Sequence, residues 1–290
     1  ELFNWTIGGM GLTGVILNIA FYLHPVNTSW IKQKTIPAKN IDHAIKIFEE
    51  NLESTYSVAW LDCLSKGDKL GRSIVMLGEH AKISDLNFSM KKDPLIIMNK
   101  KKIRIIFNFP SFILNTLTIK IFNNMYYFFS KKKKSYNLVD YDSYFYPLDY
   151  LLDWNKIYGC NGFIQFQCVL PLKNASVGIR ELLEAVSNSK SSSFLTVLKR
   201  FGKQESFFSF PMEGYTLTLD FPVTKRNIEL MELLDKITIK YKGRFYLAKD
   251  SRMTNRTLEK SDNRFEKYKK FRSLKMKKSF SSVQSERLGL

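Results

Sequence analysis

The sequence predicts an α+β protein built on a mostly antiparallel sheet with helices on one face. The stretches 162–170, 194–202 and 215–221 alternate apolar and polar residues, which is the two-residue period of a half-buried strand. Apolar residues at helical spacing in 176–186 and 227–237 separate these stretches. The resulting order of strand, helix, strand, strand, helix and strand is typical of an antiparallel sheet covered by helices on one side.

Length and composition describe a globular protein of one or two domains. The chain has 290 residues, of which 44% are hydrophobic, so it is long enough to bury a core. Its formal net charge of +18 favours an anionic partner, such as nucleic acid, anionic lipid headgroups or a phosphorylated substrate. The cysteines, Cys63, Cys160 and Cys168, have neither metal-ligand spacing nor the count of a disulfide framework. We therefore predict no metal site and expect a reducing compartment.

No targeting signal is visible, and no stretch of 18 apolar residues occurs. The nearest approach is Phe112–Phe129, which polar residues such as Asn115 and Lys120 interrupt. We expect this stretch to be an amphipathic or interfacial segment, followed by the basic run Lys131–Lys134.

The chain opens with a glycine-rich stretch, Gly8–Gly14, followed by an apolar run, Ile16–Leu23, that we expect to form a strand. The glycine spacing superficially matches the dinucleotide-binding fingerprint. That fingerprint needs a strand before it and a helix after it, which is not the predicted context. The glycines therefore predict a tight turn, or backbone held close to a flat or phosphorylated group.

The rest of the first half contains fewer regular elements. A helix is predicted from Asn40, which is a good capping residue, and strands are predicted at Tyr56–Asp62 and Gly71–Gly78. Tyr136–Tyr146 is rich in Tyr and Asp, and we expect a mobile loop there. Pro147–Tyr158 is predicted to be helical.

The predicted sheet has one apolar and one polar face. In the strand at 162–170, Phe166 and Cys168 lie on the apolar side, and Gln165 and Gln167 lie on the other. Five side chains share the polar face: Gln165, Gln167, Lys199, Thr216 and Thr218. Such a face is either an ordinary solvated surface or the wall of a binding cavity, where a few placed polar groups bind a ligand.

Lys249 lies in a stretch, Gly243–Arg252, that alternates like a strand after a helix-ending glycine. Phe245, Leu247 and Lys249 share one side of that strand, so a face that begins as core ends at a cation. Two interpretations stay open: a surface lysine that extends its amine to water, or a cation directed at a ligand or reacting centre. A helical and strongly basic tail follows from Thr254.

Six stretches occur in the order and spacing seen in one family of enzymes: GGMGLTGVIL, YSVAWLD, PLDYLLDWNKIYGCNGFIQFQ, SFLTVLKRFG, SFPMEGYTLTLDFP and GRFYLAKDSR. Over nearly its whole length the chain resembles the vanillyl-alcohol-oxidase-type flavoproteins, and within them the enzymes that oxidise a polyprenyl-phosphoryl ribose. The resemblance implies FAD as cofactor and three segments. Residues 1–26 would end an FAD-binding domain, 27–243 would form the substrate-binding cap, and 244–290 would return to the FAD-binding domain. The chain would then be a C-terminal fragment that binds FAD poorly by itself.

The resemblance also assigns residues. Those placed along the flavin are Gly9, Gly11, Thr13 and Ile16, with Tyr246 close to it. Lys249 corresponds to the active-site lysine beside the isoalloxazine ring. Those that line the substrate pocket are Gln167, Lys199, Phe201, Trp60 and Gln165. Three further pocket positions depart from related actinobacterial enzymes: Thr216, Thr218 and Phe145 stand where those have Asn, Cys and Tyr. The sugar epimer and the lipid carrier therefore stay open.

The implied reaction is oxidation of a secondary hydroxyl of a polyprenyl-phosphoryl pentose, with hydride transfer to the flavin. Lys249 would stabilise the oxygen that gains negative charge, or act as general base. The implied partners are the lipid-linked sugar phosphate, a short-chain dehydrogenase that completes an epimerisation, and a membrane surface. The implied location is the cytoplasm or the inner-membrane surface.

Three alternatives stay open. An aldonolactone oxidase of the same flavoprotein class would act on a soluble sugar lactone. A basic nucleic-acid-binding module is disfavoured, because the aromatic residues occupy alternating core positions and no groove-reading motif is present. The third is a cap that binds a partner without catalysing a reaction.

Overall fold

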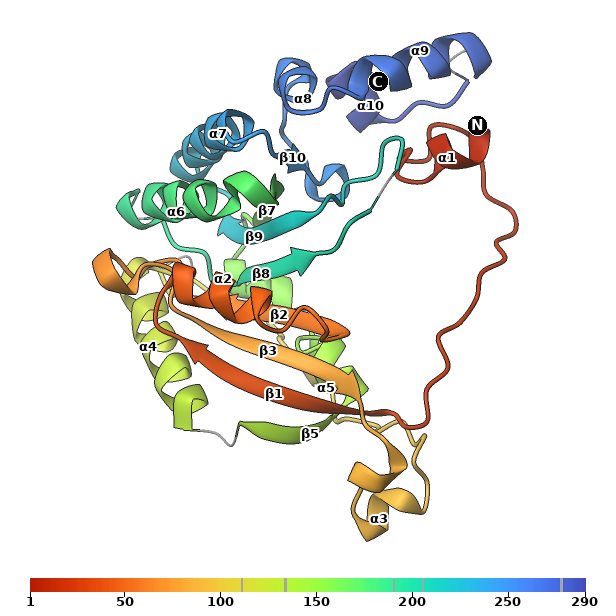
Figure 1. The fold of residues 1–290 in the computed structure, drawn as a ribbon. Helices are drawn as coiled ribbons and strands as arrows, with labels where there is room; N and C mark the ends of the chain where they lie inside the picture. Colours follow the sequence, from red (N-terminus) through yellow and green to blue (C-terminus); the bar gives the residue numbers. More distant parts are fainter. Residues whose placement is uncertain (111, 133–134, 190, 205, 277–278) are drawn as a thin grey trace.

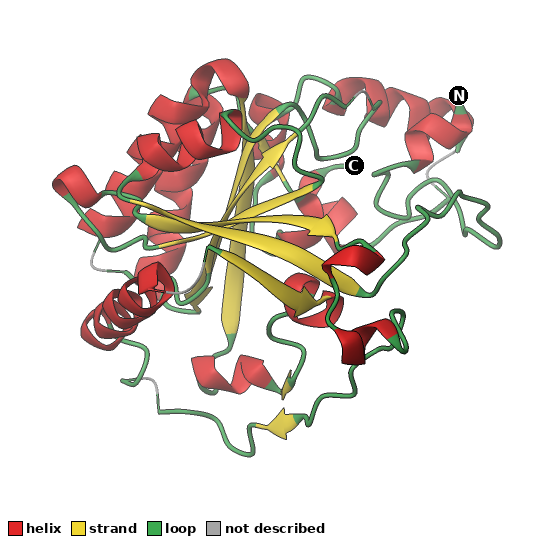
Figure 2. Ribbon diagram, turned by 60° about the horizontal axis from the view of Figure 1, so that its bottom comes forward, coloured by secondary structure: helices red, strands yellow, loops and turns green. Residues whose placement is uncertain are grey.

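The computed structural model describes residues 1–290 except 111, 133–134, 190, 205 and 277–278. An eight-stranded sheet organises the chain, with strand order β10-β7-β9-β8-β2-β3-β1-β5 (Figures 1 and 2). All of its strand pairs are antiparallel. Its strands are β1 (Trp30–Ala38), β2 (Tyr56–Leu61), β3 (Ser73–His80), β5 (Tyr136–Asp140), β7 (Phe163–Pro171), β8 (Thr196–Phe201), β9 (Gly214–Pro222) and β10 (Arg244–Phe245). A separate parallel pair joins β4 (Ile103–Arg104) to β6 (Leu151–Leu152).

The helices connect these strands and form the tail. They are α1 (Leu2–Thr6), α2 (Ile41–Glu49), α3 (Phe88–Lys91), α4 (Thr116–Lys132), α5 (Tyr141–Phe145), α6 (Leu172–Asn188), α7 (Lys225–Lys240), α8 (Asn255–Ser261), α9 (Phe265–Lys275) and α10 (Val283–Leu288). No helix in the described parts of the chain is both long and apolar enough to cross a membrane.

The sheet consists of two units with the same topology. The first runs β1-α2-β2-β3-α4-β5 and the second runs β7-α6-β8-β9-α7-β10. Within each unit the last strand lies beside the first, and the third lies between the first and second, which is the ferredoxin-like arrangement. The units join where β2 pairs with β8. By this topology α2 corresponds to α6, and α4 corresponds to α7.

The main core lies between the sheet and the helices α2, α6 and α7. Phe166, Cys168 and Leu170 of β7 are buried there, as are Leu217 and Leu219 of β9. Two of these helices begin where a side chain accepts from a free backbone N–H: Asn40 caps α2 and Thr224 caps α7. The predicted α+β class, with a mostly antiparallel sheet and helices on one face, is confirmed.

Three local predictions were wrong. Tyr136–Tyr146 is not a loop but contains β5 and α5, and Pro147–Tyr158 is not a helix but contains β6 and a 3₁₀ turn, Trp154–Tyr158. Ile16–Leu23 forms no strand. No neighbouring strand in the described chain pairs with it, so its backbone lacks the ladder that defines a strand. Residues 15–27, here called the strap, are exposed instead.

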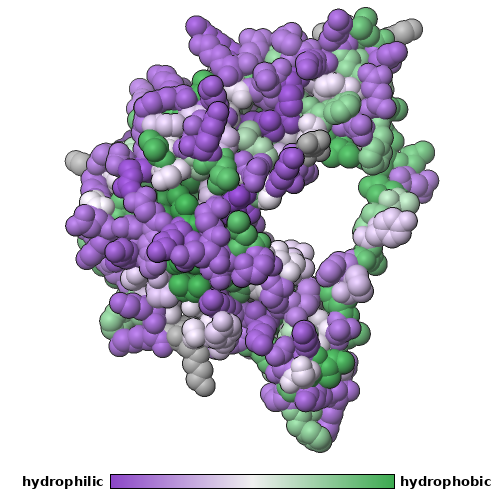
Figure 3. Space-filling view, viewed as in Figure 1, coloured by the Kyte–Doolittle hydropathy of each residue, from purple (hydrophilic) through white to green (hydrophobic). Residues whose placement is uncertain are grey.

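The opening helix is anchored on the tail. Trp5 packs against Phe271 of α9, with ring centroids 5.4 Å apart, and Tyr268 donates a hydrogen bond from its hydroxyl to the carbonyl of Gly9. The two ends of the chain therefore lie side by side (Figure 1). The strap then runs back to β1, and Figure 3 shows an opening between the strap and the rest of the molecule.

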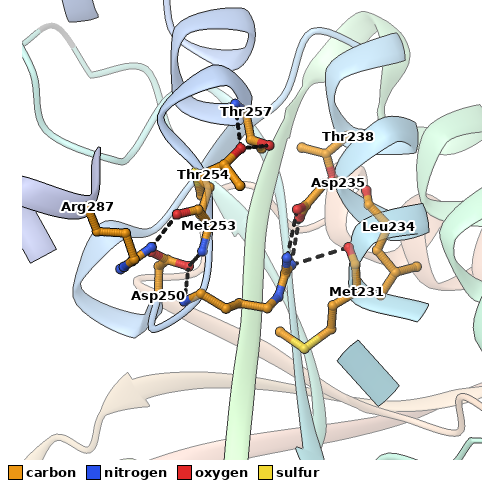
Figure 4. A network of polar contacts seen from close by, with 10 residues as sticks. Met231, Leu234, Asp235, Thr238, Asp250, Met253, Thr254, Thr257 and Arg287 are labelled. Atoms are coloured by element: carbon orange, nitrogen blue, oxygen red, sulfur yellow. Dashed lines mark hydrogen bonds and ion pairs between the residues drawn. The ribbon is translucent and has the colours of Figure 1, made fainter. Parts of the chain in front are cut away.

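A buried ion pair fixes the start of the tail to α7 (Figure 4). Arg252 donates from both terminal nitrogens to Asp235, each at 2.8 Å, and also to the carbonyl of Met231. Asp250, two residues earlier, accepts from the backbone of Met253 and from Arg287 of α10. The segment that follows Lys249 is thus held from both sides.

Asp235→Ala should lower the free energy of unfolding by about 3 kcal/mol or more, because Arg252 would lose its buried counter-ion. Urea unfolding measures this change. Glu232→Ala, on the exposed side of the same helix, is the control and should change it by less than about 0.5 kcal/mol. Equal effects of the two substitutions would show that the pair does not anchor the tail.

Candidate functional site

Lys249 lies on the polar face of the sheet because its strand stops early. β10 pairs Phe245 with Cys168, and the last ladder bond runs from the backbone of Tyr246 to Gln167. Continued pairing would place Lys249 opposite Ile164, on the apolar face. Instead a 3₁₀ turn, Leu247–Lys249, bends the chain, and the prediction of a strand through this lysine was wrong.

The amine of Lys249 contacts a polar pair across β7 and β9. Its Nζ donates to Oε1 of Gln165 at 2.8 Å, and Nε2 of Gln165 donates to Oδ1 of Asp220 at 2.9 Å. Gln165 and Asp220 are directly opposite one another in the strand register. The two neighbours fix the orientation of the Gln165 amide, since its oxygen must meet the cation and its NH₂ must meet the carboxylate.

Asp220 is a buried carboxyl group. Its side chain is 0% exposed, and among the described residues its Oδ2 has no hydrogen-bond partner. Loss of hydration raises the pKa of Asp220 to about 6, although the hydrogen bond from Gln165 and the charge of Lys249 oppose the rise. Tyr158 is also buried; its hydroxyl has no hydrogen-bond partner in the described chain, and burial and the nearby Asp220 raise its pKa.

Next to this group lies a second polar set. Gln167 donates to the hydroxyl of Thr216 at 3.2 Å, and Thr216 donates to the carbonyl of Cys168. Thr218 lies opposite Gln167, and Lys199 lies opposite Thr216. Partial loss of hydration lowers the pKa of the Lys199 amine, and the charge of Lys249 adds to this effect. Two amines on one face therefore favour an anionic ligand.

An aromatic group borders the polar face. Tyr246 stacks on Phe210 at 4.8 Å between ring centroids, and Phe210 meets the edge of Phe201 at 6.0 Å. Phe210 follows Ser209, and a side chain at Gly8 would lie 2.4 Å from the Cα of Ser209. The opening turn therefore packs directly against the loop that carries Phe210.

The structure brings together most, but not all, of the predicted site residues. The register places Trp60 in line with Val197, Thr218 and Gln167, on the polar face. Phe145 lies farther along this face, where its ring contacts Tyr56 at 4.8 Å, four residues from Trp60 on β2.

The four residues predicted to lie along the flavin divide into two pairs. Gly9 is buried against Tyr268 of the tail and Thr13 is buried beside Thr6, whereas Gly11 and Ile16 are exposed.

Three residues of the site were not predicted. Asp220 was not included in the site, although its alternation with Thr216 and Thr218 places it on the polar side of the same strand. Tyr158 and Phe210 come from irregular segments, where no periodicity shows which way a side chain points.

Comparison with known proteins gives two informative relatives. No protein-family model matches the chain. The chain is 31% identical over 296 residues to decaprenylphosphoryl-beta-D-ribose oxidase of Mycolicibacterium smegmatis, which covers the whole chain and 64% of that protein. It is 25% identical over 302 residues to an "uncharacterized protein in mprA 5'region" of Streptomyces coelicolor, covering 81% of that protein. The resemblance predicted from the motifs is confirmed, and the chain spans just under two thirds of the first relative.

Solved structures give a weaker likeness. A single-residue variant of berberine bridge enzyme has a TM-score of 0.46 at 12% identity, covering 89% of this chain and 55% of that one. A berberine-bridge-like enzyme of Arabidopsis thaliana, number 28, has a TM-score of 0.45 at 11% identity, covering 89% and 56%. Likeness at this level supports no statement about function.

Asp220→Asn should stabilise the protein, and more so at higher pH. The raised pKa of Asp220 means that ionisation costs more in the folded state, so the wild type loses stability as the pH rises from about 4 to about 6. The gain from Asn should therefore grow by about 2 kcal/mol between roughly pH 4.5 and pH 8. Urea unfolding over this range measures it, with the exposed Asp149→Asn as control. A gain that does not change with pH would contradict a raised pKa.

Proposed function

We propose that this chain forms the substrate-binding part of an FAD-dependent oxidoreductase that oxidises a secondary hydroxyl of a polyprenyl-phosphoryl pentose. The observation that carries the proposal is the amine of Lys249, 2.8 Å from Gln165, on a face shared with Gln167 and Lys199. Identity of 31% along the whole chain to an oxidase named for a decaprenylphosphoryl ribose supports the substrate class.

The residues present fit a flavin. Backbone near the opening turn is open to a ligand, because apart from the adjoining residues no heavy atom of the described chain lies within 4 Å of a Cβ built on Gly11 or Gly14. The amine of Lys249 and the amide of Gln167 suit the polar edge of an isoalloxazine ring, and the Tyr246 ring suits its flat face. Gly9, Thr13 and Ile16 would complete the contact from the turn and the strap. When bound, FAD would accept the hydride from the carbinol carbon.

Lys249 would act on the reacting oxygen. The hydroxyl proton must be removed as hydride leaves the carbinol carbon, and the oxygen becomes alkoxide-like where the proton departs ahead of the hydride. A cation held at that oxygen stabilises the transition state more than the ground state. Gln165 keeps the amine in place, and Asp220 keeps Gln165 in its orientation. Asp220 is therefore a positioning residue.

The remaining residues would bind the substrate. Gln167, Thr216 and Thr218 supply hydrogen-bonding groups for sugar hydroxyls, and Lys199 supplies a cation for the phosphate. Trp60 and Phe201 would provide apolar walls, and Phe145 would lie at the far end of the face. The segments 1–26, 27–243 and 244–290 would serve as the end of an FAD-binding domain, the cap and the return. A short-chain dehydrogenase would reduce the ketone, and the location would be the cytoplasm or the inner-membrane surface.

The proposal predicts that Lys249→Ala slows the reaction more than it weakens binding. In the full-length enzyme loaded with FAD, the rate of flavin bleaching on mixing with polyprenyl-phosphoryl ribose should fall by roughly a hundredfold, about 2–3 kcal/mol of barrier. Gln167→Ala and Lys199→Ala should mainly raise the KM.

Lys236→Ala, on the exposed side of α7, is the matched control and should react like the wild type. Unchanged bleaching by the Lys249→Ala protein would remove this lysine from the mechanism. Failure of the wild type to bleach with the lipid-linked pentose, together with bleaching by a sugar lactone, would replace the proposed substrate.

A further inference from the structure

Helix α4 turns an apolar face to solvent. Leu117, Ile121, Met125 and Phe128 follow each other at helical spacing and share one side of the helix. They are 67%, 51%, 54% and 52% exposed. Phe122 and Phe129, at the margins of this side, are exposed as well. These six residues are called the outer face of α4.

The opposite side of α4 is fixed to the protein by polar contacts. Asn123 is buried and donates to Asp62 at 2.7 Å, and Asp62 is held in turn by Arg72. Tyr126 packs on Trp60 with ring centroids 4.6 Å apart. The helix therefore cannot rotate its apolar side inward without leaving the Asp62 carboxylate short of a donor.

α7 follows the third strand of the second unit as α4 follows the third strand of the first, but the two helices lie on different faces of the sheet. α7 covers the apolar face and buries Leu230, Met231, Leu234 and Ile237 there. α4 packs instead on Trp60, on the polar face, and its outer face stays exposed. An exposed apolar face of this kind marks an interaction surface.

The charge around α4 indicates an anionic partner. Residues 94–139 contain nine Lys and Arg and no Asp or Glu, so they carry half of the net charge of +18. Lys100 and Arg104 are paired with aspartates outside this stretch. Lys120, Lys131 and Lys132 have no acidic partner among the described residues, and Lys132 lies 4.1 Å from the centre of the Phe128 ring. Lys133 and Lys134 lie outside the described residues.

We propose that the outer face of α4 docks on a bilayer that contains anionic lipid. The leucine, isoleucine, methionine and phenylalanine side chains enter the boundary between headgroups and acyl chains, and Lys131 and Lys132 contact headgroup phosphates. A second copy of the chain fits less well, because it would bring two clusters of unpaired lysines together. The outer face presents hydrocarbon at its centre, which a nucleic acid does not need.

The test is flotation with lipid vesicles. The chain should float with phosphatidylcholine vesicles that contain phosphatidylglycerol, and much less with phosphatidylcholine alone. Replacing Leu117, Met125 and Phe128 by Ser should lower the partition coefficient at least about tenfold. Replacing Val177, Leu233 and Leu274 by Ser is the control, because these residues are similarly exposed on α6, α7 and α9. This control should leave the partition coefficient unchanged.

A pair of charge-reversal variants tests how much the lysines contribute to vesicle binding. Lys131→Glu with Lys132→Glu should weaken binding to the anionic vesicles, and added salt should weaken it in the wild type. Lys267→Glu with Lys270→Glu, exposed on α9, changes the net charge equally and should have a smaller effect. Circular dichroism and the Tm check that each variant is folded.

A further variant serves if the triple substitution does not fold. Met125→Cys with Cys160→Ser leaves Cys63 and Cys168 buried and permits labelling of α4 with a polarity-sensitive dye. The dye emission should shift to the blue with anionic vesicles.

Flotation of the triple variant like the wild type, or no blue shift, would overturn the proposal. The proposal would also be overturned if light scattering detected a dimer that the triple substitution abolishes, while flotation stays the same. No flavin or turnover enters these measurements, so they fail or succeed independently of the proposed oxidation.

Discussion

The cross-strand register of β7 and β9 is the constraint on which the site depends. Side chains alternate between the two faces of a strand, so a slip of one residue would exchange the core with the polar face. With Phe166 opposite Leu219, and Gln165 opposite Asp220, the apolar residues face α6 and α7 and the polar residues face the other way. The core that stabilises the fold therefore also determines which groups lie near Lys249.

Lys249 itself depends on contacts from the far end of the chain. The 3₁₀ turn that carries it is short and has few bonds of its own. Gln284 of α10 donates to the carbonyls of Leu247 and Asp250, and Arg287 binds the Asp250 carboxylate. The last helix thus holds both ends of the turn. A tail that looks from its composition like a basic appendage is part of the support of the site.

The sequence predicted the strands β2, β3, β7, β8 and β9 but not β1 and β5, and it was insufficient where the chain leaves the sheet. Alternation in 162–170 and 215–221 predicted both faces correctly, because packing against helices enforces a strict period of two. The same reasoning failed at Lys249, where alternation continues along the sequence while the backbone turns after Phe245. It failed again at the strap, where apolar residues suited to a strand have no ladder partner in the described chain. Contacts between distant segments decide both cases, and a local pattern does not contain them.

Trp60 connects the two surfaces for which functions are proposed. The strand register aligns Trp60 with Val197, Thr218 and Gln167 across the polar face, and its ring packs on Tyr126 of α4. A lipid-linked sugar has its polar end and its hydrocarbon end in one molecule, so an enzyme for it needs a polar face and an apolar face joined by fixed structure. The first unit of the fold would provide the apolar face through α4, and the second unit would provide the polar face through β7 and β9.

Because the buried Asn123–Asp62 contact fixes α4 to the end of the sheet, a bilayer under α4 would hold the polar face at a constant orientation to the membrane. The two units, which share one topology, would then each recognise one part of the same substrate.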